Sequence, residues 1–434
     1  MNESSLGERD AKVIWHPYTQ HQNHDIPIPI VKGKDALLYD EDGNEYIDAI
    51  SSWWVNLHGH AHPYIAEKIY QQALILEQVI FTSFTHEPAV VLAERLLSIL
   101  PSKPAKIFYS DNGSTAVEVA LKMAIQFWQN RGETKRTKIL AFEHAYHGDT
   151  FGAMSVSGRS VFTDAFRDLL FETIFIETPR AGNMDQIKSI IQSHEDGIAA
   201  FIYEPLLQAA GGMRMYPAEC LDELLAYVRS KQILCIADEV LTGFGRTGPL
   251  FASESLHHPA DLLCLSKGLT GGAMALGVTA SSQPVFDAFL SDDRTRTFFH
   301  GHSFTANPLA CTAALASLDL LEEKSCRDQI KYIQSEHEKF VKDELSRSNE
   351  DVFRNIRMMG TILAFELNTG RDEYINHVGA EIMKLALRQG IYLRPLGNTV
   401  YLMPPYCIRP DQLRKIYHFI LSLRFTLTAS TRNA

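Results

Sequence analysis

Short, continuous apolar runs that alternate with helical patterns restrict the fold of this 434-residue chain more than any other feature. Each run is bounded by turn residues, and the runs lie at 106–110, 138–142, 173–178, 198–205, 233–238 and 261–266. Between the first two runs, apolar residues recur at the spacing of a helix: Val117, Ala120, Leu121, Ala124 and Trp128. Because strands buried on both faces read as continuous apolar runs, the pattern predicts an α/β protein whose large, mainly parallel sheet carries helices on both faces.

The ends of the chain differ in character from its middle. A chain of this length exceeds one compact core, so two domains are expected. Beyond about residue 320, an amphipathic helix marked by Ile330 and Ile333 is followed by shorter apolar runs, which predict a smaller α+β unit. Near the start, Asp42–Asn44 form a turn signal between two alternating runs, which predicts a hairpin. We expect three segments: an N-terminal segment and hairpin that joins the small domain (1–60), a large domain (61–320) and a C-terminal small domain (321–434).

Charge and composition exclude several classes of protein. The net charge of -11 argues against a nucleic-acid surface, which needs a basic stripe. No run of 18 apolar residues occurs, and the start "MNESSLGERD" lacks the apolar centre of a secretion signal. The six cysteines are scattered without a C-x-x-C pair, as in a reduced compartment. We therefore expect a cytoplasmic protein with small-molecule partners, no membrane segment and no nucleic acid.

The segment "GFGRTG", residues 243–248, matches the G-x-G-x-x-G pattern of dinucleotide-binding turns and follows an apolar run. Such a turn should open a helix directly, so that the free amides of the helix meet the pyrophosphate. Here Pro249 follows, and the acidic pair Asp238–Glu239 would lie beside the pyrophosphate. A lone match in this context is weak, and we do not expect a dinucleotide site.

Two neighbouring strand ends carry residues that suit another cofactor. Asp238 ends the run 233–238, and Lys267 follows the run 261–266 and precedes a group of glycines. A lysine in this position either reaches solvent or forms a Schiff base opposite an aspartate that holds a pyridinium proton.

Two further segments favour the Schiff-base interpretation. Gly113 and Ser114 open a helix after a strand, where amides, a hydroxyl and the positive helix end can hold a phosphate. Tyr146, after another strand, offers a face for a flat ring. A phosphate site, a stacking face, an acid and a lysine are what pyridoxal phosphate requires.

Four segments carry a resemblance to a known family: "ADEVLTGFGRTG", "CLSKGLTGG", "SDNGSTAVEVALKMA" and "AYHGDTFGAMSVSG". Over nearly its whole length the chain resembles the class III, pyridoxal-phosphate-dependent aminotransferases of fold type I. The resemblance implies that Lys267 forms the imine with the cofactor and that Asp238 pairs with its ring nitrogen. It also implies that Gly113 and Ser114 take the phosphate while Tyr146 lies against the ring.

The same resemblance implies a homodimer with active sites shared across the interface. In the family, a Gly-Pro-Thr turn of the neighbouring subunit contacts the phosphate. Here the turn reads Gly301-His302-Ser303, so that Ser303 keeps the hydroxyl whereas His302 departs from the usual proline. A backbone amide at His302 can still serve the phosphate.

Four more segments narrow the resemblance: "WHPYTQ", "SSWWVNLHGHAHP", "HGHSFTANPLAC" and "LRPLGNTVYLMPPY". They are similar to a branch that transfers an amino group from S-adenosylmethionine to 8-amino-7-oxononanoate in biotin biosynthesis. The resemblance assigns Tyr18 and Trp53 to a wall of the substrate pocket, and Arg394 to a substrate carboxylate. The substrate contacts that it implies are Tyr18, Trp53, Tyr146, Lys267, Gly301, Arg394 and Tyr401.

Several alternatives stay open or are disfavoured at this point. Lysine is an alternative amino donor for the same reaction, and other class III ω-aminotransferases form a second alternative. Those acting on ornithine, acetylornithine or 4-aminobutyrate commonly carry Gly-Glu-Gly-Gly after the "EP" strand, whereas Ala210 replaces that glutamate here. A non-catalytic protein of the same fold is disfavoured by the intact Lys267 and Asp238. The histidines of "HGHAH" lack further ligands nearby, so no metal is expected.

Overall fold

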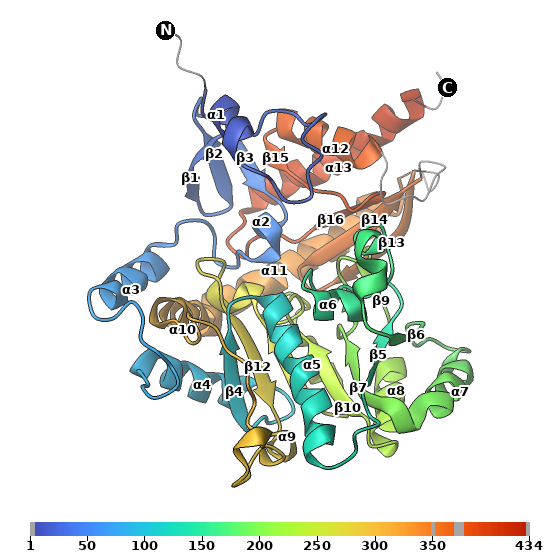
Figure 1. Cartoon of the computed structure of the whole chain (residues 1–434). Coiled ribbons are helices and arrows are strands. Elements are labelled where there is room, and N and C mark those ends of the chain that lie inside the picture. Colours follow the sequence, from blue (N-terminus) through green and yellow to red (C-terminus); the bar gives the residue numbers. More distant parts are fainter. Residues whose placement is uncertain (1–4, 349–351, 369–376, 431–434) are drawn as a thin grey trace.

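The computed structural model describes residues 5–348, 352–368 and 377–430. A seven-stranded sheet forms the centre of the larger part, in the order β4-β12-β11-β10-β7-β5-β6 (Figure 1). Its strands are β4 (Lys106–Ser110), β5 (Lys138–Phe142), β6 (Thr173–Ile176), β7 (Ile198–Tyr203), β10 (Leu234–Asp238), β11 (Leu262–Leu265) and β12 (Gly277–Ser281). The five neighbouring strands from β11 to β6 run parallel, which confirms the predicted mainly parallel sheet.

Strand β12 is the member of this sheet that the apolar pattern missed. It runs antiparallel to both of its neighbours, β11 and β4. Its sequence, "GVTAS", contains no apolar run, yet every residue in it is buried. The Thr279 hydroxyl donates a hydrogen bond of 2.8 Å to the carbonyl oxygen of Ala116, which satisfies a polar group inside the core. Small polar residues can therefore occupy a central strand here.

Helices cover both faces of the large sheet, as predicted. Helix α5 (Gly113–Asn130) lies on one face, and α7 (Met184–His194) and α8 (Ala218–Ser230) lie on the other (Figure 1). Along β7, Ile202 packs with the α5 side and Phe201 packs with the opposite side. Each strand of the centre therefore contributes alternate side chains to two separate hydrophobic cores.

Further helices surround this sheet. Helix α10 packs against both α3 and α4 beside the β4 edge. The bounds of these shorter or peripheral helices are α3 (Pro63–Ala73), α4 (Glu87–Ile99), α6 (Phe151–Val156), α9 (Gln283–Asp287) and α10 (Pro308–Glu322). Across the described residues, none of the helices has the length and apolar character needed to cross a membrane.

The described residues in the last quarter of the chain form a smaller antiparallel sheet with three α-helices. The elements are β13 (Phe353–Met359), β14 (Ile362–Leu367), β16 (Thr399–Leu402), α11 (Lys324–Phe340), α12 (His377–Arg388) and α13 (Pro410–Ser430). Strand β14 lies between β13 and β16. The pattern predicted β14 and β16 but not β13, whose sequence "FRNIRMM" places charged and polar residues on an edge strand.

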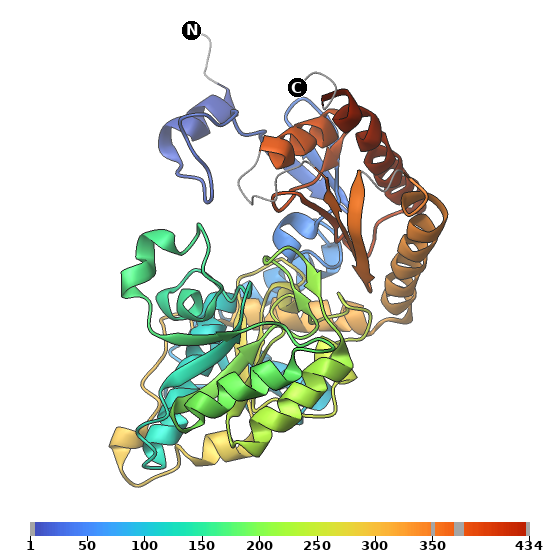
Figure 2. The same ribbon diagram turned by 90° about the vertical axis from the view of Figure 1, so that its right-hand side faces the viewer.

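The N-terminal hairpin completes its sheet with a strand from the far end of the sequence. Strands β1 (Ile30–Lys34), β2 (Leu37–Asp40) and β3 (Glu45–Asp48) are antiparallel, which confirms the predicted hairpin. Strand β15 (Ile391–Tyr392) pairs with β3 in parallel. Figure 2 shows the small sheets grouped together above the large one, with α1 (Leu6–Val13) to one side. Residues of the two chain ends therefore meet beside the large sheet.

Candidate active site

A cavity of about 570 Å³ opens at the carboxyl ends of β10 and β11, opposite the first turn of α5. In sheets with parallel strands, ligands bind at this edge. The predicted residues that line the cavity are Tyr18, Trp53, Gly113, Ser114, Tyr146, Asp238 and Lys267. Six distant segments of the sequence therefore meet around one space.

Lys267 directly follows the end of β11 and starts a short 3-10 turn with a positive φ of 45°. Burial lowers the pKa of its ammonium group, while the negative charges of Asp238 and Glu204 oppose that change. The Nζ atom lies 4.9 Å from the centre of the Trp54 ring. A buried amine with a lowered pKa loses its proton more readily than a surface lysine, as a nucleophile or base requires.

Asp238 ends β10 and is buried beside an imidazole that the sequence analysis did not single out. Its Oδ2 atom lies 2.6 Å from Nδ1 of His147, and its Oδ1 atom accepts a 3.0 Å hydrogen bond from the amide of Val240. These two contacts fix the orientation of the Asp238 carboxyl group beside the imidazole of His147. His147 follows Tyr146 in the segment "AYHGDT", but only the order of the strands brings it to this acid.

Glu204 is a second buried acid that the sequence analysis missed, at the end of β7. Its two oxygens accept 3.0 Å hydrogen bonds from the amides of Tyr146 and Ala209. Burial raises the pKa of this carboxyl group to about 7. The "EP" dipeptide after an apolar run was the available signal, because it marks an acid at a strand end. We call Lys267, Asp238, His147 and Glu204 the strand-end cluster.

The first turn of α5 forms the opposite end of the cavity. Asn112 caps this helix by accepting a 3.0 Å hydrogen bond from the amide of Thr115. A Cβ atom at Gly113 would lie 2.7 Å from Val240, and one at Gly148 would lie 2.1 Å from the Ser114 hydroxyl. Glycine at both positions lets Val240 and Ser114 approach the backbone closely. The first turn of α5 itself borders the cavity, and the helix dipole favours an anion there.

Tyr146 lies at the side of the cavity and contacts the N-terminal segment. Its hydroxyl lies 3.3 Å from that of Tyr18, which also donates a hydrogen bond to the carboxylate of Asp149. Burial, followed by the hydrogen bond with Tyr18, raises the pKa of Tyr146. Asp149 thus acts as a partner of Tyr18, and its own amide donates to the Ser114 hydroxyl at 3.3 Å.

Tyr18 and Trp53 line the outer side of the cavity and contact Arg394, which is not itself among the described residues that line it; we call these three residues the outer wall. The guanidinium carbon of Arg394 lies 4.2 Å from the centre of the Trp53 ring and 5.8 Å from that of Tyr18. The rings of Tyr18 and Trp53 are 5.4 Å apart. An arginine stacked on an aromatic face keeps its N–H groups free at the edge for a carboxylate.

Tyr401, a predicted substrate contact, lies deeper than the outer wall. It is buried, and its hydroxyl accepts a 2.8 Å hydrogen bond from Nε1 of Trp54. Trp54 in turn faces the Lys267 ammonium group. The structure therefore places Tyr401 behind the tryptophan that lines the cavity.

The turn Gly301–Ser303 lies away from the cavity of its own chain and is not among the described residues that line it. The carbonyl oxygen of Ser303 accepts a 2.7 Å hydrogen bond from the side chain of Gln78. Large apolar side chains around this turn are exposed, including Phe299 at 74% and Phe304 at 63%. Exposed apolar groups of this size are typical of surfaces that contact another protein.

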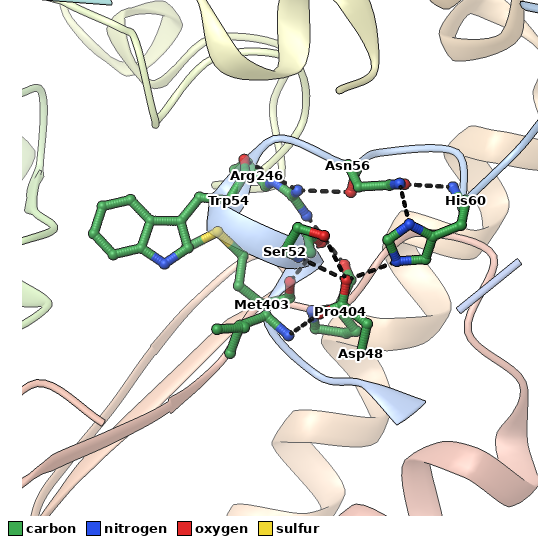
Figure 3. A network of polar contacts seen from close by, with 11 residues as sticks. Asp48, Ser52, Trp54, Asn56, His60, Arg246, Met403 and Pro404 are labelled. Carbon is green, nitrogen blue, oxygen red and sulfur yellow. Dashed lines mark hydrogen bonds and ion pairs between the residues drawn. The ribbon is translucent and has the colours of Figure 1, made fainter. Parts of the chain in front are cut away.

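The segment 243–248 forms an irregular loop after β10 and opens no helix, so it lacks the helix that a dinucleotide turn requires. Arg246, at its centre, is fully buried and was not singled out from the sequence. Its guanidinium donates 3.0 Å hydrogen bonds to the carbonyl oxygens of Pro404 and Asn56 and a 3.4 Å bond to that of Trp54 (Figure 3). The loop thereby ties the large sheet to the segment that carries the tryptophans.

Two of the histidines of "HGHAH" have polar partners in the protein. His58 contacts the hydroxyl of Ser317 at 3.0 Å, and His60 contacts the carboxylate of Asp48 at 2.9 Å. Burial lowers the pKa of His58 to about 3. Within the described part of the chain, no group of three or more His, Cys, Asp or Glu residues is arranged to hold a metal ion.

Comparisons with known proteins agree on one family. A sequence profile described as "Aminotransferase class-III" matches residues 18–422. The adenosylmethionine-8-amino-7-oxononanoate aminotransferase of Synechococcus elongatus is 48% identical over 94% of this chain and 98% of its own length.

Solved structures extend the likeness to three dimensions. That of the adenosylmethionine-8-amino-7-oxononanoate aminotransferase from Methanocaldococcus jannaschii aligns with a TM-score of 0.88 at 33% identity, over 96% of this chain and 98% of that one. An omega transaminase from Pseudomonas jessenii, in complex with PMP, aligns with a TM-score of 0.90 at 26% identity, over 98% and 99% of the two chains.

Proposed function

This chain belongs to the class-III aminotransferases, and we propose on this basis that it moves an amino group from S-adenosylmethionine to 8-amino-7-oxononanoate, giving 7,8-diaminononanoate for biotin synthesis. The relatives that carry this activity in their names support the choice of substrates. The observation that carries the chemistry is the placement of Lys267 and Asp238 at adjacent strand ends of one cavity, opposite a helix N-terminus.

We propose pyridoxal 5'-phosphate as the cofactor. The residues present fit such a group, because the cavity is lined by Gly113 and Ser114 at the first turn of α5, opposite Lys267 and Asp238. Gly113 and Ser114 would hold the phosphate, and Tyr146 would lie against the ring. When bound, this cofactor supplies an aldehyde that carries the amino group and a ring that takes up electrons.

The strand-end cluster would supply the acid–base chemistry. The carboxylate of Asp238, oriented by His147, would hold a proton on the ring nitrogen, because an opposite charge favours the protonated form. Lys267, with its lowered pKa, would anchor the cofactor and then move a proton at the substrate carbon. The catalytic residues of the proposal are therefore Lys267 and Asp238.

The substrates would contact the outer wall. Tyr18 and Trp53 present aromatic faces that suit an aliphatic chain or an adenine ring. Arg394 would bind the carboxylate of 8-amino-7-oxononanoate through its guanidinium fork. Tyr401 would support this wall through Trp54, and Gly301 would contribute from a second subunit.

A homodimer with shared sites completes the proposal. The turn Gly301–Ser303 is exposed beside the apolar side chains of Phe299 and Phe304 and lies away from its own cavity. In a dimer, His302 and Ser303 would reach the partner's phosphate site. Sedimentation equilibrium should give twice the 48.8 kDa chain mass, and a monomer with full activity would contradict the shared site.

The direct test supplies the purified protein with pyridoxal phosphate, S-adenosylmethionine and 8-amino-7-oxononanoate. Mass spectrometry should detect 7,8-diaminononanoate, which requires both substrates and disappears in the Lys267→Ala variant. Absence of this product from a protein that binds the cofactor would refute the proposed substrates.

The amino donor is tested separately by a half-reaction. The cofactor-loaded protein is mixed with S-adenosylmethionine or with lysine, and the visible absorption band of the bound cofactor is followed. S-adenosylmethionine should remove the band. If lysine alone removed it, lysine would replace S-adenosylmethionine as the proposed donor.

A class-III ω-aminotransferase of different specificity is the second candidate, because the P. jessenii omega transaminase has the same fold. Ornithine and 4-aminobutyrate serve as donors in the same half-reaction, and neither should remove the band. The division into segments 1–60, 61–320 and 321–434 and the cytoplasmic location stay predictions.

A further inference from the structure

The segment that carries both tryptophans, Ser51–Trp54 in α2, has an unusual backbone, and we call it the double-tryptophan turn. Ser51, Ser52 and Trp54 have positive φ angles of 54°, 58° and 68°, although none is glycine. Ser52 combines its positive φ with a ψ of -104°. Such conformations are disfavoured for residues with a Cβ atom and persist only where the surroundings hold them.

The carboxylate of Asp48, at the end of β3, holds this turn together with the Ser51–Met403 and Arg246–Trp54 hydrogen bonds. Oδ1 accepts a 3.1 Å hydrogen bond from the amide of Ile50. Oδ2 accepts from the amide of Ser52 at 2.6 Å and from its hydroxyl at 3.3 Å (Figure 3). Asp48 is completely buried, so these are strong, charge-assisted bonds that water does not replace.

His60 fixes Asp48 from the other side. Its Nε2 atom lies 2.9 Å from Oδ2 of Asp48, and its Nδ1 atom lies 3.2 Å from the side-chain amide nitrogen of Asn56. The Asn56 oxygen already accepts from the amide of Gly59 at 2.7 Å, so its nitrogen must face His60. Nδ1 therefore accepts and Nε2 donates, which fixes the tautomer of the imidazole.

The turn connects this buried network to the cavity. Its third residue, Trp53, stacks on Arg394, and Trp54 faces Lys267. Figure 3 shows the indole of Trp54 projecting away from Asp48 and His60. The Asp48 carboxylate does not line the cavity. Both indoles nevertheless belong to the turn whose backbone this carboxylate holds.

We propose that Asp48, oriented by His60, is a positioning residue for substrate recognition: it holds the double-tryptophan turn in the conformation that places Trp53 against Arg394. The proposal rests on the proposed function, because it assigns Arg394 to the carboxylate of 8-amino-7-oxononanoate. Loosening the turn should weaken binding of this acceptor while the cofactor and the strand-end cluster keep their places.

Asp40, at the end of β2, provides a matched control in the same sheet. It is also buried and also accepts four hydrogen bonds, from the amides of Asp42 and Asn44, the Asn44 side chain and the Tyr46 hydroxyl. Its partners hold the hairpin turn between β2 and β3 and do not line the cavity. Asp40→Asn therefore removes a comparable carboxylate without touching the double-tryptophan turn.

The experiment measures KM and kcat for 8-amino-7-oxononanoate in Asp48→Asn, Asp40→Asn and the unchanged protein. Asp48→Asn should raise KM about tenfold and change kcat by less than about threefold, because uniform binding is lost and the chemistry is not. Its visible cofactor band should be unchanged. Asp40→Asn should keep both constants. Equal KM values in the two variants would overturn the proposal.

If Asp48→Asn does not fold, two variants of His60 test the role of Asp48 instead. In His60→Gln, the amide nitrogen of the new side chain can take the place of Nε2 and donate to Asp48, whereas the side chain in His60→Asn is too short to reach it. His60→Asn should raise KM about threefold and His60→Gln should keep KM. The reverse order, or no change in either, would contradict the role of Asp48.

Glycine at position 52 tests the strain itself. Because glycine accepts a positive φ readily, the double variant Asp48→Asn/Ser52→Gly should recover part of the KM lost in Asp48→Asn. An unchanged or larger KM would show that Asp48 does not act through this backbone. If the unchanged protein forms no 7,8-diaminononanoate, the proposed function fails; if it does and Asp48→Asn behaves like Asp40→Asn, only this inference fails.

Discussion

The strand-end cluster and the outer wall face the same cavity from two kinds of structure. Asp238 ends β10 and Lys267 begins the 3-10 turn after β11, so two neighbouring parallel strands bring both residues to one edge of the sheet. Tyr18, Trp53 and Arg394 come from three distant segments, and Trp53 belongs to a turn with disfavoured backbone angles. The proposed reacting groups are thus placed by neighbouring strand ends, although Lys267 itself has a positive φ, whereas the proposed recognition residues come from remote segments that include a strained turn. Changes in the first should alter the chemistry, and changes in the second should alter affinity.

The largest effect should come from removing the lysine of the strand-end cluster. Lys267→Ala should lower activity by a factor on the order of 10⁴ and abolish the visible cofactor band, because no other group can supply its amine. Absorbance after incubation with pyridoxal phosphate checks this result. Lys138→Ala, which removes a lysine paired with Glu172 at 2.7 Å near the surface, is the control. A persisting band in Lys267→Ala would assign the anchor to another lysine.

Asp238→Asn should keep the cofactor bound but lose turnover by a factor on the order of 10³, because the neutral amide no longer favours a proton on the ring nitrogen. The loss should appear in kcat with little change in KM, as expected for the side of the cavity that performs the chemistry. Steady-state kinetics and the absorbance of the purified variant measure the two properties. Near-normal kcat would contradict the role of this acid.

Glu204 makes the strand-end cluster sensitive to pH. Its pKa is about 7 in the folded protein and near 4.5 when exposed, so the folded state binds more protons in this window. Stability from this group is complete below pH 4.5 and is lost as pH rises to about 7. The free energy of unfolding lost over this pH range is about 3 kcal/mol, because each unit of pKa shift corresponds to about 1.36 kcal/mol.

Thermal unfolding of Glu204→Gln at pH 5 and pH 8 tests this linkage. Relative to the unchanged protein, the variant should be more stable at pH 8 than at pH 5, because glutamine does not titrate. Glu172→Gln, which alters an exposed acid, should show no such trend. A pH-independent difference for Glu204→Gln would place the pKa of Glu204 outside this range.

The smallest of these effects should come from the outer wall and should be confined to affinity. Arg394→Ala should raise KM for 8-amino-7-oxononanoate by about 10- to 100-fold, the equivalent of one charge-assisted hydrogen-bonded pair. The KM of Arg394→Lys should lie between those of Arg394→Ala and the unchanged protein, because an ammonium group keeps the charge but lacks the planar fork. The cofactor band should be normal in both variants. A fall in kcat at unchanged KM would remove the distinction between the two regions.

The parts of the fold that could be predicted from sequence are those with local signals. Apolar runs predicted the six strands β4, β5, β6, β7, β10 and β11, and the Asp42–Asn44 turn predicted the β2–β3 hairpin. Strand β12 was missed because its small polar residues are satisfied by partners such as Ala116, which lie far away in sequence. Strand β13 was missed because an edge strand tolerates charged residues.

The candidate site shows the same division. Motifs pointed to Lys267, Asp238 and the start of α5, which the structure brings to one cavity. His147, Glu204 and Arg246 were missed. A buried histidine or arginine has no local pattern that distinguishes it from a surface residue, whereas Glu204 had the "EP" signal after an apolar run, which was not used. Each is recognised by its partners: the carboxylate of Asp238, two amides and three carbonyl oxygens, respectively.

By itself, the sequence determined the alternation of strands and helices, the chemical type of the reacting residues and their places at strand ends, because periodicity and turn residues act over a few positions. Only the tertiary structure decided which acid meets which imidazole, how β15 completes the N-terminal sheet, and why Asp48 and His60 lie behind the tryptophans. These contacts join residues that are remote along the chain. Their energies depend on burial and on the pairing of each polar group, which exist only once the chain has folded.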